Sequence, residues 1–475
     1  MIKAFFWKLL ERFGVQGSSF ILQIFLARLL TPEHYGALSI MAIFTTLANV
    51  FIHSGFNTAL IQNKDTKEED YLSVFWVSLG VACVLYVLLF FGAPLIAQFY
   101  DMPEIVLPFR ALALVLFPGA LNSVQIAKVS RELDFKQIFK SNVIAIIMSG
   151  IIGIVLAYYG AGLWALVTQN IVNVCLATVI MLFTVPIKFR LHINFGRIKI
   201  LFAFGWKLLA SNLLENIYAD LRALVVGKKF SSVTLGFYNR GKQFPQFIIS
   251  AANDTAKSVM LPIMSRQQNN GNSIKGITRN SVIVSSYIVF PIMFGLAGVA
   301  TPLVSLLLTD KWLPCVAFLQ IHCFAFSINP ISSCNLQAIN AIGRSDIFLK
   351  LEIIKRVLGT VSIVVAVVLF DTPLALAYTS LIMGAVVLFL NAFPNKKLIG
   401  YSYFEQIKDI LPSLLAALVM FVAVLAVGKL AINNILILIV QVAVGVTVYV
   451  AISAILKLKP FLICLDMVKK FIKKA

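Results

Sequence analysis

Charged side chains are scarce in this sequence. Asp, Glu, Lys and Arg make up 13% of its 475 residues, whereas a soluble globular protein carries roughly 25%. Hydrophobic residues account for 60%, and they occur in long continuous runs rather than in short alternating ones. This composition excludes a soluble globular chain. It predicts an all-α polytopic membrane protein, because helices satisfy their own backbone hydrogen bonds in lipid.

Clusters of metal-binding or reactive side chains are also lacking. The six cysteines form no CxxC pair, and the four histidines lie far apart along the chain. This spacing indicates neither a disulfide scaffold nor a metal site, and motifs such as HExxH and GxSxG are absent. No loop is long enough to fold a soluble catalytic domain. The sequence therefore predicts a protein that is not an enzyme and that uses no cofactor.

What the sequence has instead is a series of apolar runs, which predicts about 14 membrane-spanning helices of ~20 residues each. The predicted spans are 12–31, 37–60, 72–96, 108–129, 141–159, 162–185, 201–226, 234–257, 281–307, 314–340, 351–370, 373–393, 410–428 and 433–456.

Basic residues collect in alternate connecting segments. If the N-terminus is cytoplasmic, the cytoplasmic segments hold 30 of the 40 Lys and Arg residues. The positive-inside rule then places both termini in the cytoplasm and makes the number of spans even. No cleavage site follows the first apolar run, so an uncleaved first helix is expected. The net charge of +20 reflects this orientation and attraction to anionic headgroups, not binding to nucleic acid.

An internal repeat underlies the spans. LARLLTPEHYG (Leu26–Gly36) resembles VGKKFSSVTLG (Val226–Gly236) at an offset of 200 residues. Further pairs follow at offsets of 208 and 212: Pro94-Leu95 with Pro302-Leu303, and Pro118, Gln125 and Asp134 with Pro330, Gln337 and Asp346. The drifting offset predicts two parallel six-helix lobes, 1–199 and 200–399, followed by two extra helices and a basic tail in 400–475.

The first two helices of the second lobe carry unusually many ionisable groups for membrane segments. One stripe at helical spacing consists of Lys207, Ser211, Glu215, Tyr218 and Arg222, and the stripe on the next helix of Asn239, Gln243, Gln246, Ser250 and Lys257. Charge facing lipid costs several kcal/mol, so these stripes are predicted to face a bundle interior or a wet cavity. The alternative is that some are snorkelling ends or structural ion pairs, such as Glu215 with Arg222.

The matching helices of the first lobe are polar but mostly neutral. Their inward positions are predicted to be Arg12, Gln16, Ser19 and Gln23, then Asn49, His53 and Asn57. A lone histidine on such a face is more often structural than a proton relay, but His53 remains a candidate because its ordinary pKa is near 6.5. Arg28 and Arg110 lie near the predicted outer face, where each is either a gate or an interfacial anchor.

Three segments carry a family resemblance: RFGVQGSSFILQIFLARLLTPEHYGALSI, VSRELDFKQIFKSN and FSSVTLGFYNRGKQFPQF. They resemble Wzx-type polysaccharide flippases of the multidrug/oligosaccharidyl-lipid/polysaccharide exporter superfamily, especially colanic-acid and lipopolysaccharide exporters. The resemblance implies transfer of an undecaprenyl-pyrophosphate-linked oligosaccharide from the cytoplasmic to the periplasmic leaflet of a bacterial inner membrane. It also implies alternating access through a central cavity and, as partners, membrane lipids and the polysaccharide polymerase machinery.

The same resemblance implies a cationic cavity. The positions that fit phosphate binding are Lys207, Arg222, Arg240 and Lys242. The positions that fit hydrogen bonding to sugars are Asn212, Asn216, Tyr218, Asn239, Gln243 and Gln246. Proton or sodium coupling would use Glu215, Asp220 or His53, with membrane potential as the other source of drive, and Arg28 would be a gate.

Two alternatives remain open on the sequence. An ion-coupled multidrug cation antiporter of the same superfamily would want a net acidic cavity, and here basic residues outnumber the acids Glu215, Asp220 and Asp254. A membrane-embedded glycan polymerase or ligase would usually need a large outer loop, and the longest one expected here, around 101–108, is short.

Overall fold

The computed structural model describes residues 2–53, 56–62, 66–132, 134–185, 193–265, 267, 271–430 and 433–462. The side chains at 2–6, 8–13, 62, 204, 251–259, 261–262, 265 and 271–272 are outside this description, which therefore excludes the side chains of Arg12, Asp254 and Lys257.

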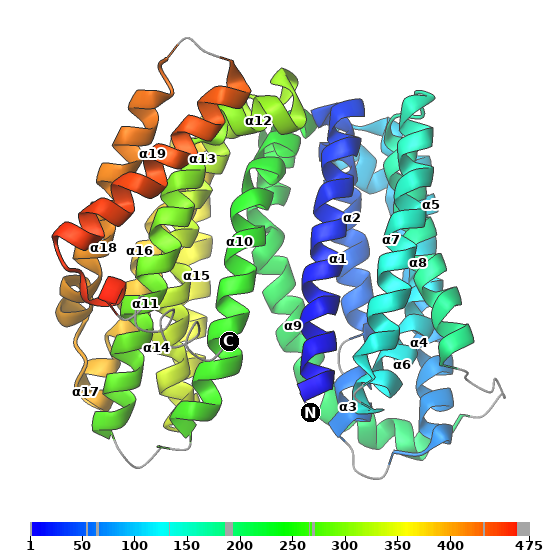
Figure 1. The fold of residues 1–475 in the computed structure, drawn as a ribbon. Helices are drawn as coiled ribbons and strands as arrows, with labels where there is room; N and C mark the ends of the chain where they lie inside the picture. Colours follow the sequence, from blue (N-terminus) through cyan, green and yellow to red (C-terminus); the bar gives the residue numbers. More distant parts are fainter. Residues whose placement is uncertain are drawn as a thin grey trace. The chain divides into compact units, whose positions relative to one another are not determined.

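The described residues form helices joined by short turns, without a strand among them (Figure 1). The first nine α-helices are α1 (Ile2–Leu29), α2 (Pro32–His53), α3 (Phe56–Gln62), α4 (Glu68–Phe99), α5 (Val106–Leu112), α6 (Leu116–Glu132), α7 (Phe135–Tyr158), α8 (Leu163–Thr184) and α9 (Phe195–Lys229). The others are α10 (Ser232–Ser265), α11 (Gly271–Gly298), α12 (Ala300–Leu308), α13 (Cys315–Ser327), α14 (Asn329–Ala341), α15 (Ser345–Leu369), α16 (Pro373–Ala392), α17 (Asn395–Ile399), α18 (Tyr403–Val427) and α19 (Asn434–Ile455). Short 3-10 turns are Pro103–Ile105, Ala113–Val115 and Asp310–Trp312.

The helices confirm the predicted polytopic membrane fold. Among the described residues, ten segments are long and apolar enough to cross a membrane. The long helices α1, α9, α10 and α15 are more polar, and with them the number of membrane-length helices is about 14, as the apolar runs predicted. Within the described residues, predicted span 108–129 is divided at the 3-10 turn Ala113–Val115 and predicted span 314–340 at Ile328. Predicted span 281–307 breaks at Val299 between α11 and α12. Pro302 explains the break, because a residue without an N–H fits the first turn of a helix better than its interior.

The chain forms two compact units, Met1–Gly236 and Phe237–Ala475. In the first unit, α7 packs against α1 and α8, α4 packs against α6, and α9 packs against α2, α3 and α4. In the second unit, α18 packs against α11 and α19, and α16 packs against α13 and α15. The packing therefore groups α9 with the helices before it. The repeat-based division after residues 199 and 399 stays a prediction about internal duplication.

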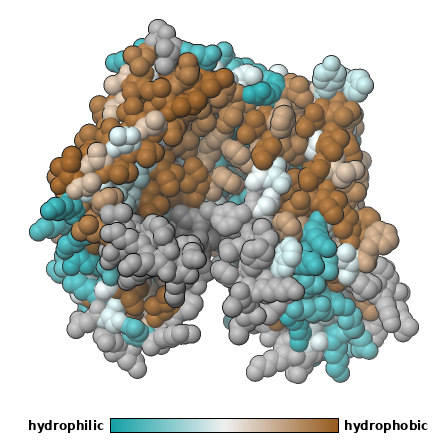
Figure 2. Space-filling view, in the orientation of Figure 1, coloured by the Kyte–Doolittle hydropathy of each residue, from teal (hydrophilic) through white to brown (hydrophobic). Residues whose placement is uncertain are grey.

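Each unit buries a core of its own and exposes apolar side chains outward. Phe56, Tyr71, Phe75 and Leu201 are part of one core cluster of the first unit. On the outside, Phe183 is 85% exposed. Figure 2 shows hydrophobic side chains over the flanks of the helices and hydrophilic ones gathered toward their ends. This distribution is the one that a lipid environment stabilises.

Proline residues inside two helices free backbone carbonyls that side chains of neighbouring helices then bind. Pro94 of α4 has no N–H for the carbonyl of Phe90, and Arg110 of α5 donates its Nε–H to that oxygen at 3.0 Å. The Arg110 guanidinium also lies 4.1 Å from the centre of the Phe90 ring. In the second unit Pro291 frees the carbonyl of Tyr287, which accepts the Tyr449 hydroxyl of α19 at 2.8 Å. Arg110 thus stabilises a helix break, a role that neither sequence interpretation anticipated.

We expect Arg110→Met to lower the free energy of unfolding by about 1–3 kcal/mol, because it leaves the Phe90 carbonyl without a donor in an apolar region. Pro94→Ala returns an N–H to α4 at the position that pairs with Phe90. The same Arg110→Met change should therefore cost less in a Pro94→Ala background. Thermal melting of the four detergent-solubilised proteins measures this coupling, and equal losses in both backgrounds would contradict the assigned role.

Candidate functional site

The repeated motif forms a reciprocal contact within the first unit. Thr31 and Ser231, which correspond in the repeat, each precede a helix. The Thr31 hydroxyl lies 3.1 Å from His34 Nδ1, and Ser231 Oγ accepts the backbone N–H of Thr234 at 3.1 Å. A Cβ on Gly36 would lie 1.8 Å from the carbonyl oxygen of Ser232, and one on Gly236 would lie 2.1 Å from the carbonyl oxygen of Pro32. The starts of α2 and α10 therefore touch backbone to backbone, with equivalent residues exchanged.

The polar stripe of α9 lies away from the face that packs inside the first unit. The buried positions of α9 include Leu201, Gly205, Ala223 and Val226, whereas Lys207, Ser211 and Glu215 are exposed and Tyr218, Asp220 and Arg222 are half-buried. Asn212 and Asn216 are half-buried as well, and the Asn216 amide donates to the Asn212 carbonyl at 2.7 Å. Asn212 and Asn216 follow the buried Gly205 by seven and eleven residues, which places them on the packed side of α9. That all these side chains line a cavity stays a prediction.

Two charged residues of the α9 stripe, Lys207 and Glu215, stand outside the ion pairs of the described residues. The Glu215–Arg222 pair considered from the sequence is therefore not formed. The Arg222 guanidinium lies 5.9 Å from the centre of the Tyr218 ring, at cation–π distance. Two ionisable groups therefore remain available on a membrane-length helix.

Arg240 on α10 is placed differently from the other predicted cations. Its side chain is buried, with 4% of the residue exposed. The guanidinium donates Nη1–H to Gln243 Oε1 at 2.6 Å and lies 5.2 Å from the centre of the Trp312 ring. Asn239 and Lys242 are half-buried and Gln246 is exposed. Arg240 is therefore part of the interior of the second unit.

The candidate His53 belongs to a small polar group between α2 and α6. A Cβ on Gly119 would lie 3.0 Å from Asn49 Oδ1 and 3.7 Å from His53 Nε2, so both side chains approach α6 where it carries no side chain. Asn57, in α3, is half-buried. Arg28 is exposed in the last turn of α1. Among the described residues, no three His, Cys, Asp or Glu side chains come together as a metal site requires.

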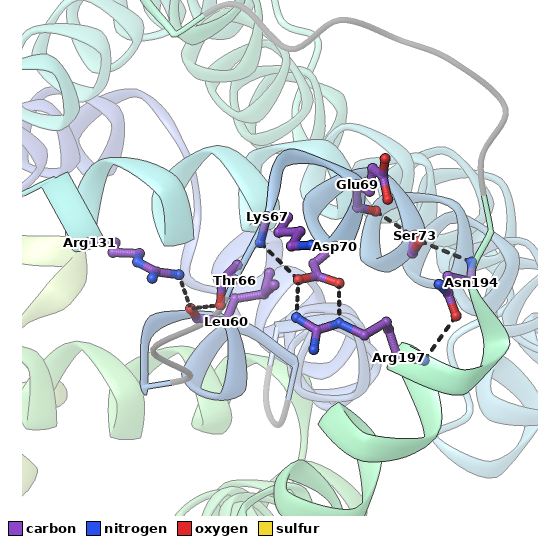
Figure 3. A network of polar contacts seen from close by, with 9 residues as sticks. All are labelled: Leu60, Thr66, Lys67, Glu69, Asp70, Ser73, Arg131, Asn194 and Arg197. Atoms are coloured by element: carbon purple, nitrogen blue, oxygen red, sulfur yellow. Dashed lines mark hydrogen bonds and ion pairs between the residues drawn. The ribbon is translucent and has the colours of Figure 1, made fainter.

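A bidentate ion pair of the first unit lies at residues that the sequence did not indicate as a site. Asp70, in the first turn of α4, accepts two hydrogen bonds from Arg197 of α9: Nε to Oδ1 at 2.9 Å and Nη2 to Oδ2 at 2.7 Å (Figure 3). The backbone N–H of Lys67 also donates to Asp70 Oδ2 at 2.9 Å. Around this pair, Asn194 caps α9 by accepting the Arg197 N–H and donates its own N–H to Ser73 Oγ.

These contacts fasten the start of α9 to the start of α4. The Asp70 side chain is 4% exposed and that of Arg197 30%. Lys67, Glu69, Asp70, Asn194 and Arg197 line a polar pocket of about 390 Å³. The sequence gives no sign of the Asp70–Arg197 pair, because a pairing across more than a hundred residues leaves no local pattern.

The second unit has a comparable bidentate ion pair between α11 and α18. Arg279 donates Nε and Nη2 to the two carboxylate oxygens of Asp409 at 2.8 and 2.7 Å. The hydroxyl of Tyr401 donates to Asp409 Oδ2 at 2.8 Å. Burial, together with this bond to a carboxylate, raises the pKa of the Tyr401 phenol. In each unit, therefore, a bidentate Arg–Asp ion pair joins two long helices near their ends.

Fold and site together define a multi-pass helical membrane protein with ionisable and hydrogen-bonding groups on its spanning helices. The model of the polysaccharide biosynthesis protein family matches residues 25–317, and the chain belongs to this family. The resemblance inferred from the sequence motifs is thereby confirmed.

Two curated relatives illustrate the relationship. The chain is 23% identical over 308 residues to the teichuronic acid biosynthesis protein TuaB of Bacillus subtilis, covering 64% of this chain and 63% of the relative. It is 22% identical over 306 residues to the succinoglycan biosynthesis transport protein ExoT of Rhizobium meliloti, covering 64% and 62%. The chain thus spans less than two thirds of the length of these relatives.

Among solved structures, the lipid II flippase MurJ in an inward closed conformation has a similar fold. Its TM-score is 0.75 at 14% identity, and the match covers 96% of this chain and 99% of MurJ. At this identity the likeness establishes the fold of the chain and nothing about its substrate.

Proposed function

We propose that the protein is a flippase that transfers an undecaprenyl-pyrophosphate-linked oligosaccharide from the cytoplasmic to the periplasmic leaflet of a bacterial inner membrane. The match to the polysaccharide biosynthesis family over residues 25–317 carries this proposal. Relatives named for teichuronic acid and succinoglycan biosynthesis, and a flippase fold, support it. Both chain termini would be cytoplasmic, as the distribution of basic residues predicts, and the polymerase machinery would take up the product.

The physical problem of this reaction is to move charge and hydroxyl groups across hydrocarbon. A pyrophosphate with attached sugars loses its hydrogen bonds to water when it enters lipid, at a cost of several kcal/mol per group. Cationic and amide side chains on spanning helices replace those bonds. An Arg guanidinium donates two parallel hydrogen bonds to a phosphate, whereas a Lys ammonium attracts it as a compact point charge.

Side chains of α9 and α10 supply these groups. We assign phosphate binding to Lys207, Arg222 and Lys242, which are exposed or half-buried. Arg240 is buried against Trp312, and we assign it a positioning role for α10 instead of direct binding. Sugar hydroxyls would bond to Asn212, Asn216, Tyr218, Asn239, Gln243 and Gln246.

One observation favours ion coupling as part of the mechanism. Glu215 is exposed and has no ion-pair partner among the described residues, so it can bind a proton or a sodium ion without breaking a structural contact. The same acid on α9 would suit a cation antiporter, the second candidate function. The family match favours the flippase.

Export of surface polysaccharide in cells that lack their own flippase tests the proposal. Arg222→Gln and Lys242→Gln keep side-chain length but lose the charge, and each should lower export about tenfold, since a hydrogen bond to a charged group contributes ~1.5–3 kcal/mol. Lys228→Gln is the matched control, because Lys228 pairs with Asp101 at an exposed site. Normal export by Arg222→Gln and Lys242→Gln at normal membrane levels would refute the assigned site.

A further inference from the structure

The short helix α17 presents two lysines at one end of the second unit. It runs from Asn395 to Ile399 between α16 and α18, and Gly400 ends it with a positive φ of 69°. Asn395 and Ile399 lie one turn apart and are buried, whereas Lys396 and Lys397 are exposed. The lysines therefore point away from the unit on a helix whose other face is held in its interior.

A buried amide network holds that inner face. The Asn395 side chain donates to Asn335 Oδ1 at 2.7 Å. Asn335 and Gln406 exchange two amide hydrogen bonds of 2.8 and 2.9 Å. At most 1% of each of these three residues is exposed. Because buried amides are costly to unpair, the network fixes the position of α17 and of its two lysines.

The acidic residues nearest in sequence to Lys396 and Lys397 already bind other side chains. Asp409 binds the Arg279 fork and the Tyr401 hydroxyl. Glu405 accepts the N–H of Ser402 at 2.8 Å and pairs with Lys275 at 3.3 Å. Among the described residues, Lys396, Lys397 and Lys408 have no acidic partner. This end of the unit therefore carries uncompensated positive charge.

Aromatic side chains border these lysines. Phe389 stacks near Phe393 and Tyr403, with ring centres 5.7 and 5.2 Å apart, and Tyr403 neighbours Phe404 at 5.9 Å. Phe393 is 66% exposed and Phe404 82%. In Figure 2 the hydrophilic side chains at this end lie below a hydrophobic flank. Exposed aromatic rings beside lysines, at the ends of spanning helices, are typical of the membrane interface.

We propose that α17 with Phe393, Phe404 and Lys408 is a binding surface for an anionic phospholipid. Lys396 and Lys397 hold the phosphate of the headgroup. Phe393 and Phe404 pack against the upper part of its acyl chains, and Lys408 extends from α18 one turn beyond Phe404. The positive-inside rule puts this end of the unit at the cytoplasmic leaflet, where anionic lipids attract basic residues.

Binding of a fluorescent phosphatidylglycerol to the purified full-length protein in detergent tests the surface. Each lysine near an anionic lipid contributes about fivefold in affinity, so the Lys396→Gln/Lys397→Gln variant should bind this lipid roughly 30-fold more weakly at low salt. Added salt should shrink the difference, because it screens exposed charge. Lys429→Gln, at the opposite end of α18, is the matched control and should bind like the unchanged protein.

Three comparisons keep the proposal falsifiable. Phosphatidylcholine with the same chains should bind more weakly than phosphatidylglycerol, and glycerol phosphate should not compete. Phe404→Ser should weaken phosphatidylglycerol binding at low and high salt alike. The proposal is overturned if the double-lysine variant binds phosphatidylglycerol like the unchanged protein, or if free glycerol phosphate competes.

All variants alter exposed side chains, and equal melting temperatures without lipid show that they fold. Polysaccharide export is a separate readout, so failure here leaves the flippase assignment intact.

Discussion

Alanine at Gly36 or Gly236 should prevent stable folding of the region where α2 and α10 begin. The added Cβ would lie 1.8 Å from the Ser232 carbonyl oxygen or 2.1 Å from that of Pro32. Both obstacles are backbone atoms, so no change of rotamer relieves the overlap and the helix starts must move apart. Overpacking of a tight contact costs about 1–3 kcal/mol and occasionally more, and here we expect the upper end or beyond.

The reciprocal contact also predicts that the effects of Gly36→Ala and Gly236→Ala are not additive. Because each substitution forces the same two helix starts apart, the second one should add much less than the first, which is a coupling that independent sites do not show. Thermal melting in detergent and the level of membrane protein measure both effects. Gly80→Ala is the control: no atom lies within 4 Å of its added Cβ, and alanine should stabilise the interior of α4 by roughly 0.5–1 kcal/mol. Equal behaviour of Gly36→Ala and Gly80→Ala would contradict the contact.

Removing Arg197 should destabilise the first unit more than removing its partner Asp70. The Asp70 side chain is 4% exposed, and without Arg197 it keeps only the backbone N–H of Lys67. A buried charge left unpaired costs about 3–5 kcal/mol, so Arg197→Ala should lower the free energy of unfolding by ~3 kcal/mol. Arg197 is 30% exposed and regains water when Asp70 is removed, so Asp70→Ala should cost roughly half as much.

Two comparisons separate the ionic pair from general damage. In the double variant Asp70→Ala/Arg197→Ala the stranded carboxylate is gone, so it should be more stable than Arg197→Ala alone. Lys228→Ala breaks the exposed pair with Asp101, whose two side chains are 42% and 82% exposed, and should cost less than about 1 kcal/mol. Chemical unfolding of the detergent-solubilised protein gives these values. If Asp70→Ala proved the costlier change, the assignment of Asp70 as the desolvated partner would be wrong.

Periodicity alone grouped Lys207, Ser211 and Glu215 on one side of α9. The structure leaves these three residues outside the packed face. Helical spacing succeeds because a side chain's direction around the axis follows from the 3.6-residue turn. The number of membrane-length helices was predictable for a similar reason, since bilayer thickness sets the length of an apolar run.

Contacts between residues far apart in the sequence could not be predicted from helical period or hydropathy. Nothing around Arg110 shows that it binds the carbonyl freed by Pro94, and nothing around Arg240 shows that it packs against Trp312. Spacing likewise suggested Glu215 with Arg222, a pair that does not form. Such contacts depend on which helices become neighbours, and side-chain chemistry allows several choices.

The sequence by itself determined that the chain crosses a membrane as a helical bundle, which helices carry charge, and to which family the protein belongs. Tertiary structure decided which charged side chains form bidentate ion pairs, as Asp70 and Arg197 do. It also decided which have no ion-pair partner among the described residues, such as Glu215 and Lys396. The division has a physical cause: hydropathy and helical period are properties of neighbouring residues, whereas the desolvation of a charge depends on every helix that packs around it.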